Sequence, residues 1–437
     1  MQAKRGKRAA CLGLAAVMVC SVGALSGCSG ESADGKVHIE LFHYKMEAAK
    51  YFDELAAKFN AENPDIVLEV QSPNDAMTIL KTRLIREDPP DIVGIGGDIN
   101  FSYLLDSDMI LDISDFEGIG DVKESYLDMA KTLEFVPKDG VYSVPYAANA
   151  SGVLYNKAMF DANGWQTPTT WSEFMSLCQQ IESEGVAPFT LGYKDSWTTL
   201  APWNALAVSL VDDQLFNRVN LGQDTFGNGY DLVADRQAEM TQYCGNDAFA
   251  YGYNDACTAF AREQCAMYPI GSFAIAQIKS VNPDMEIGSF VMPANEEADG
   301  NILNSGIDLQ FAVMKDAVTT PEKKEACYKV LEFLEKDENI QSYITAQTAV
   351  PCKKGDFTLA SEIMGMKPYL DAEKMADYQD HHYPAEMSVD ARIQTFLVGG
   401  DKQDFFDWFD SEWIKANRDI IAKQKAYADA HGGELGG

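Results

Sequence analysis

The chain has 437 residues, of which 46% are hydrophobic, and it carries a formal net charge of −32 at pH 7. This charge argues against nucleic-acid binding, because phosphate contacts need clustered lysine and arginine side chains. The length is sufficient for two to three domains with a sizeable hydrophobic core.

The first segment in chain order, residues 1–27, is a predicted secretion signal. A basic start precedes an uncharged apolar stretch from Ala9 to Leu25, which is the pattern of a signal peptide. The alternative is a transmembrane helix. The stretch has 17 residues and contains glycine and serine, whereas a spanning helix needs about 20 apolar residues. The signal peptide is therefore favoured.

The signal ends in Leu25-Ser26-Gly27-Cys28, which resembles the lipobox of bacterial lipoproteins. The resemblance implies that Cys28 is lipidated and becomes the first mature residue. More than one acyl chain gives stable anchoring. Residues 28–36 are rich in serine and glycine and predict a short flexible tether. The expected location is the outer face of the cell membrane.

The start of the body alternates between strand and helix patterns, which predicts an α/β fold with a mostly parallel sheet. The strands are expected at 37–41, 66–70 and 91–95, and the helices at 51–59 and 80–85.

The sequence also indicates where later helices begin. Thr170 and Glu173 have capping-box spacing, and Thr320-Pro321 places a cap before a proline at the first helical position. From about Glu338 the chain has mainly helical patterns. The six cysteines after Cys28 are scattered with no CxxC spacing, so packed thiols are favoured over disulfides, although export permits disulfides.

Several segments, taken in order, resemble the extracellular solute-binding proteins of ATP-driven carbohydrate importers. They span nearly the whole body and are Pro145–Lys157, Pro168–Phe174, Thr198–Asn204, Tyr253–Phe260, Ala266–Ala274, Ser305–Asp308 and Asp380–Pro384. The resemblance implies an α/β, two-lobed periplasmic-binding-protein type II fold with hinge strands, an interlobe ligand cleft and a helical C-terminal region.

The expected lobe boundaries follow from the same resemblance, with the first crossing in Pro145–Tyr155. Lobe one would comprise residues 37–147 and 287–340, and lobe two would comprise residues 148–286 and 341–437.

Candidate ligand-binding residues were sought directly after predicted strands, because ligands of open α/β sheets lie beyond the carboxyl ends of strands. Lys45 follows the first strand, Asn100 follows the Gly96-Gly97 turn, and Asp308 lies beside an expected crossing strand. Lysine, amide and carboxylate groups suit sugar hydroxyls. The alternative roles are an exposed surface side chain for Lys45, a helix cap for Asn100 and an acid paired within the protein for Asp308.

Asp380 and His381 lie in a predicted loop and complete the polar candidates. The flat face of a sugar favours an aromatic ring. Phe273 follows a strand end where the family often places a stacking aromatic, although many relatives have tryptophan there. Trp203 and Trp197 are the other platform candidates, with core packing as the alternative.

The predicted function is capture of a carbohydrate and its delivery to the transmembrane subunits of an ABC permease, by a hinge-closing monomer held at the membrane. An α-linked oligosaccharide is expected from the similarity of the Asp380–Pro384 stretch to raffinose- and isomaltose-type binders. We expect no enzymatic activity, no cofactor and no metal. Adjacent histidines such as His381-His382 rarely converge on one ion.

Two alternatives remain open at the level of sequence. A surface glycoside hydrolase needs two carboxylates about 5 to 10 Å apart, and the chain contains no GxSxG or HExxH signature. A receptor for a polyamine or a peptide would suit the acidic body. The candidate aromatic, amide and histidine residues fit a neutral polyol better.

Overall fold

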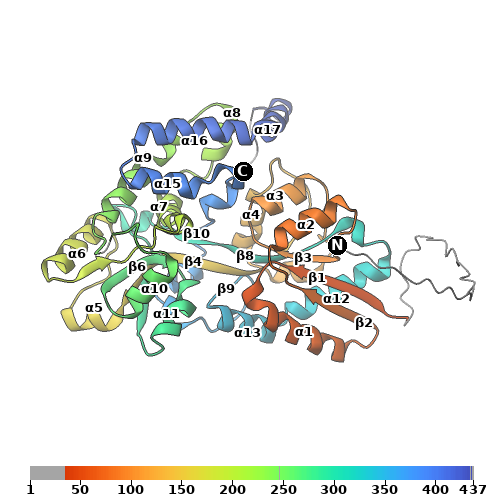
Figure 1. Cartoon of the computed structure of the whole chain (residues 1–437). Coiled ribbons are helices and arrows are strands. Elements are labelled where there is room, and N and C mark those ends of the chain that lie inside the picture. The colour runs from red at the N-terminus through yellow and green to blue at the C-terminus, as the bar shows by residue number, and fades with distance from the viewer. Residues whose placement is uncertain (1–34, 246, 434, 436–437) are drawn as a thin grey trace, which may run out of the picture.

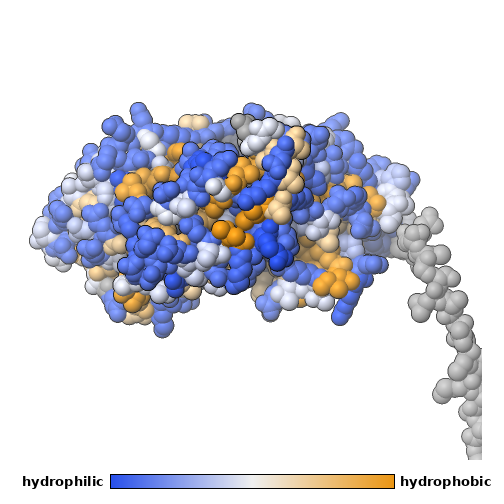
Figure 2. All heavy atoms as spheres, turned by 90° about the horizontal axis from the view of Figure 1, so that it is seen from above, coloured by the Kyte–Doolittle hydropathy of each residue, from blue (hydrophilic) through white to orange (hydrophobic). Residues whose placement is uncertain are grey.

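The computed structural model describes residues 35–245, 247–433 and 435 (Figure 1). The predicted signal and Cys28 lie outside the described residues. Two groups of helices flank a central mixed sheet whose main strand order is β2-β1-β3-β8-β4-β6-β5. Most of the surface seen from above is hydrophilic, with hydrophobic atoms gathered near the middle of that face (Figure 2).

The first lobe confirms the predicted α/β opening. Strand β1 pairs in parallel with both β2 and β3. Helix α1 buries Phe52, Leu55 and Phe59 at helical spacing, so this one face packs on the sheet. The elements are β1 (Val37–His43), α1 (Ala49–Glu62), β2 (Ile66–Gln71), α2 (Ala76–Ile85), β3 (Ile92–Ile95), α3 (Ile99–Asp106), α4 (Glu124–Thr132), α12 (Pro321–Leu334) and α13 (Asp337–Gln347).

Two long strands join the lobes, β4 (Val144–Asn156) and β8 (Leu303–Val313). They run antiparallel, with Ala148 opposite Ile307 and Ser151 opposite Asn304. The end of β8 pairs with β3, and the end of β4 pairs with β6 and β7. Each strand therefore belongs to both lobes, as hinge strands must.

The second lobe is built around β5, β6 and β7 and is mostly helical. Its core contains Phe174, Trp203, Tyr230, Phe409 and Trp413. The elements are α5 (Lys157–Asn163), α6 (Trp171–Ser183), β5 (Ala187–Phe189), α7 (Leu200–Leu210), α8 (Leu215–Leu221), α9 (Phe226–Thr241), α10 (Tyr253–Ala261), β6 (Cys265–Gly271), α11 (Ala274–Val281), β7 (Ile287–Phe290), α15 (Val389–Leu397), α16 (Lys402–Ala416) and α17 (Arg418–Ala430).

The chain after α13 returns along the hinge through three short elements. They are β9 (Val350–Pro351), which pairs with β4, α14 (Lys367–Asp371), and β10 (Met375–Ala376), which pairs with β8.

Strand pairing bears on the expected lobe boundaries. Strand β7 pairs with the far end of β4, and Phe290 packs in the core of the second lobe. Tyr343 of α13 packs instead with Phe52 of the first lobe. We therefore propose that the chain recrosses along β8, after Leu303 rather than near Ile287, and returns after β9 rather than near Gln341.

The predicted helix starts are confirmed. The Thr170 hydroxyl accepts a bond from the Glu173 N–H over 3.3 Å, and the Thr320 hydroxyl accepts one from the Lys323 N–H over 3.2 Å. Five body cysteines are buried, in keeping with a packing role: Cys178, Cys257, Cys265, Cys327 and Cys352. No helix among residues 35–245 and 247–433 has the length and apolar character needed to cross a membrane.

Candidate functional site

A cavity of about 250 Å³ lies between the lobes, beside the two hinge strands. Its size is near the lower limit of roughly 300 Å³ for small-molecule pockets. Both lobes and both hinge strands contribute to its lining, which consists of Tyr44, Gly96, Asp98, Asn149, Trp197, Leu200, Ala201, Asn204, Phe273, Gly306, Ile307, Asp308, Tyr378, Asp380 and His381.

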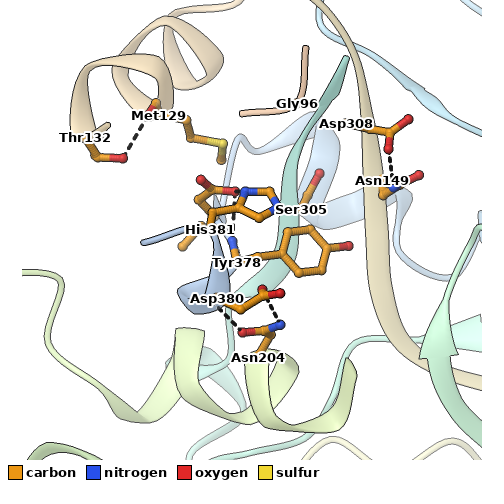
Figure 3. Close-up of polar contacts among 12 residues, drawn as sticks. Gly96, Met129, Thr132, Asn149, Asn204, Ser305, Asp308, Tyr378, Asp380 and His381 are labelled. Atoms are coloured by element: carbon orange, nitrogen blue, oxygen red, sulfur yellow. Dashed lines mark hydrogen bonds and ion pairs between the residues drawn. The ribbon is translucent and has the colours of Figure 1, made fainter. Parts of the chain in front are cut away.

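Asp308 on β8 is the best-connected acid in this cavity. Its Oδ1 accepts bonds from Lys45 Nζ over 3.0 Å and from Asn149 Nδ2 over 2.9 Å (Figure 3 shows the second). Lys45 Nζ also lies 2.9 Å from Asp308 Oδ2. The Tyr44 hydroxyl donates to the Asp308 backbone carbonyl. The carboxylate is therefore fixed in position, with remaining lone pairs available to a ligand.

Lys45 is not among the residues that line the cavity. Its ammonium contacts Asp308 and, over 2.8 Å, Glu47. Burial lowers the pKa of Lys45, but these two carboxylates outweigh burial and the pKa is raised overall. Lys45 is thus a cation that neutralises Asp308.

Asn100 also lies outside the cavity lining. Asp98 caps α3, because its Oδ1 accepts a bond from the Asn100 backbone N–H over 2.8 Å. The Asn100 side chain donates to the same oxygen over 3.1 Å. The cavity-facing residue after the Gly96-Gly97 turn is therefore Asp98, and Asn100 supports it.

Asp380 and His381 lie in a short 3₁₀ segment, η7 (Gln379–His382), and both face the cavity. Asn204 of α7 donates from Nδ2 to Asp380 Oδ1 over 2.7 Å (Figure 3). Burial raises the pKa of Asp380. His381 Nδ1 lies 2.8 Å from Asp377 Oδ1.

The charge of His381 is set by its acidic neighbours. Burial lowers its pKa, but Asp377 and Asp380 overcome that effect and raise the pKa to about 9. His381 is thus an imidazolium at neutral pH, and its ring lies 5.0 Å from the Tyr378 ring. The imidazolium therefore offsets part of the negative charge of its two carboxylate neighbours, Asp377 and Asp380.

An aromatic wall formed by Phe273 and Trp197 closes another side of the cavity, with the ring centroids 6.2 Å apart. Trp197 is 43% exposed, so this wall opens to solvent. Tyr253 continues it beyond the cavity, 5.0 Å from Trp197.

Trp203 does not line the cavity. It is fully buried, packs on Tyr230 and donates from Nε1 to the Tyr383 hydroxyl over 3.1 Å. Leu200, Ala201 and Asn204 form the face of α7 that lines the cavity. Trp203 lies off this face, and it therefore packs in the core.

Sequence reasoning missed five polar lining residues: Tyr44, Asp98, Asn149, Asn204 and Tyr378. Two of them stand in segments that carry the family resemblance, namely Asn149 in Pro145–Lys157 and Asn204 in Thr198–Asn204. A search limited to strand ends passes over a residue within a hinge strand or on a helix. No cluster of three or more His, Cys, Asp or Glu side chains suited to a metal ion occurs among the described residues.

The sequence pattern of the bacterial extracellular solute-binding proteins matches residues 45–341. The chain belongs to this family. Its relatives include the multiple sugar-binding protein of Streptococcus mutans, 29% identical over 344 residues that cover 75% of this chain and 78% of the relative. The melibiose/raffinose/stachyose-binding protein MelE of Bacillus subtilis is 24% identical over 371 residues, covering 79% of this chain and 84% of MelE.

Solved structures of this solute-binding family have the same fold. The apo form of RafE from Streptococcus pneumoniae is 26% identical, with a TM-score of 0.75 over 88% of this chain and 98% of RafE. RafE in complex with raffinose is 27% identical, with a TM-score of 0.71 over 86% of this chain and 98% of that protein. The two-lobed α/β architecture predicted from sequence is thereby confirmed.

Proposed function

We propose that this extracellular solute-binding protein captures a neutral oligosaccharide between its lobes and delivers it to the permease subunits of an ABC transporter. The observation that carries the proposal is an interlobe cavity that combines hydrogen-bonded carboxylates with an aromatic wall. The similarity to RafE, which was solved with raffinose, supports an α-linked sugar.

The pairing of the acids favours a neutral ligand. Asp308 is held by Lys45 and Asn149, and Asp380 is held by Asn204 beside the cationic His381. A paired carboxylate still accepts hydrogen bonds from hydroxyls, but it offers less unbalanced charge to a cation. A polyamine therefore gains less from Asp308 and Asp380 than it would from unpaired acids, despite the net charge of −32 for the whole chain.

The aromatic wall favours a sugar over other neutral polar ligands. Phe273 and Trp197 present apolar ring area beside polar groups, and a pyranose ring has an apolar C–H face and hydroxyl edges. Because Trp197 is 43% exposed, the wall extends out of the enclosed volume and can accommodate a ligand longer than one ring. The family consists of solute-binding proteins, which agrees with a role in binding and not in glycoside hydrolysis.

Titration calorimetry with raffinose tests the function directly. We expect saturable binding of one raffinose per chain, with no products on chromatography after prolonged incubation. Maltotriose, as a second α-linked oligosaccharide, and spermidine, as a cation, complete the comparison. Binding of spermidine with no heat from either sugar would contradict the proposal, and release of monosaccharides would point to a hydrolase.

A further inference from the structure

The C-terminal helix α17 contacts the first lobe at a place separate from the hinge strands. Lys423 forms an ion pair with Asp106, the last residue of α3. Gln424 donates from Nε2 to the backbone carbonyl of Phe135, just beyond α4, over 2.7 Å. Figure 1 shows α17 above α3, with the hinge strands β4 and β8 lower in the molecule.

The helix itself is anchored on the second lobe. Gln424 Oε1 accepts a bond from Asn220 Nδ2 of α8 over 2.7 Å, and Asn220 Oδ1 accepts one from Trp413 Nε1 over 2.6 Å. Ile421 packs in the core of the second lobe. Gln424 and Asn220 are only 6% and 4% exposed. When the lobes separate, Gln424 stays with Asn220, and its bond to Phe135 must break.

We propose that Lys423 and Gln424 form an interlobe latch and act as positioning residues that raise ligand affinity by holding the lobes together. The inference rests on the proposed function, since the ligand is taken to bind between the lobes. Tyr44 and Asp98 from one lobe and Asn204 and Phe273 from the other line the cavity. A contact that favours the closed arrangement therefore lowers the cost of assembling the site.

The size of the effect follows from the two contacts. The Gln424 bond is neutral and buried, and such bonds stabilise modestly. The ion pair joins side chains that are 45% and 32% exposed, so solvent screens much of it. Loss of the latch should weaken binding about threefold to tenfold, mainly through faster dissociation.

Gln424→Glu is the sharpest variant because it has nearly the same shape. One carboxylate oxygen keeps the bond from Asn220, while the other replaces the donor that faces the Phe135 carbonyl with a repelling acceptor. Lys423→Met removes the ion pair from an exposed position and keeps the test open if Gln424→Glu folds poorly. Lys425→Met, at an exposed position two residues along the same helix, is the matched control.

Two measurements on purified protein decide the matter. Small-angle X-ray scattering without sugar should give a larger radius of gyration for Gln424→Glu and Lys423→Met than for the wild type and Lys425→Met. Raffinose titration should show the threefold to tenfold loss for the same two variants. Pairing Lys423→Asp with Asp106→Lys should restore affinity relative to Lys423→Asp alone.

The scattering comparison needs no ligand, so it separates the latch from the proposed function. Identical sugar-free profiles for the wild type and both latch variants would overturn the latch, even if raffinose binds. Absence of raffinose binding by the wild type, with the expected change in scattering, would overturn the assigned ligand and leave the latch supported.

Discussion

For Lys45, residue type and position alone predicted a ligand as the partner of the ammonium group, whereas its partners are protein carboxylates. A lysine after a strand end predicts a donor for a ligand hydroxyl. In the structure its ammonium is committed to both oxygens of Asp308 and to Glu47. The lysine thereby holds the Asp308 carboxylate in its orientation at the cavity. Its contribution to binding is indirect, through Asp308.

Lys45→Met should weaken raffinose binding about tenfold, because Asp308 then loses a charge-assisted partner in a buried setting. Calorimetric titration with raffinose at pH 7 measures this loss. Lys50→Met, an exposed lysine on α1, is the control. Equal affinities for Lys45→Met and Lys50→Met would contradict this role for Lys45.

Site prediction from sequence depended on where each residue stood relative to its strand or helix. Phe273, Asp308, Asp380 and His381 were singled out and do line the cavity. Asn100 lies two residues after Asp98, which caps α3 and lines the cavity in its place. Which side of α7 faces the cavity depends on how the helix docks, and that separates Asn204 from Trp203. No local pattern carries that information.

At the scale of elements, the acidic residue that follows helix α12 is unusual because its side chain is buried. Glu335 is 5% exposed, and neither of its carboxylate oxygens has a partner among the described residues. Lys353 donates instead to the Glu335 backbone carbonyl over 2.7 Å. Burial raises the pKa of Glu335 to about 8. The side chain is therefore held in its protonated form at neutral pH.

The burial of Glu335 predicts that the folded chain becomes less stable as the pH rises. The unfolded chain releases the Glu335 proton near the ordinary value of about 4.5, whereas the folded chain keeps it until about pH 8. Stability from this group is therefore complete below pH 4.5 and is lost as the pH rises toward 8. Glu335→Gln should remove that loss and stabilise the fold by on the order of 3 kcal/mol at pH 7.

Urea unfolding of Glu335→Gln and the wild type at pH 5 and pH 8 checks this expectation. The gain should be larger at pH 8. Glu332→Gln, an exposed change on the same helix, should show no such dependence. A gain that is equal at the two pH values would mean that Glu335 does not titrate as its burial requires.

Whether a segment forms a strand or a helix was more predictable from the sequence than the elements with which it pairs or packs. The alternation in 37–41 and 66–70 and the capped starts at Thr170 and Thr320 are local signals, and the structure has these elements. The pairing of strand β7 with β4, by contrast, depends on contacts distant in sequence. The point at which the chain recrosses to the first lobe depends on such pairing, and it lies near Ile287 from the resemblance and along β8 in our proposal.

At the scale of the whole molecule, capture and delivery place different demands on the chain. Binding needs lobes that close on a ligand, and the hinge strands β4 and β8 with the α17 latch provide the means. Delivery needs the receptor to remain near its permease. A tethered receptor has a much higher effective concentration at a membrane partner than one that diffuses away. The lipobox-like Leu25-Ser26-Gly27-Cys28 is our proposed source of that tether.

Cys28→Ser separates these two demands. The serine hydroxyl cannot take the thioether-linked lipid, so the variant should leave the membrane fraction for the soluble fraction or the medium. Raffinose affinity of the purified variant should equal that of the wild type, because Cys28 precedes the first strand of the lobes. Cell fractionation with immunoblotting and calorimetry measure the two properties. Uptake of raffinose at low concentration should fall while binding persists. Retention of Cys28→Ser in the membrane fraction would show that another segment anchors the chain.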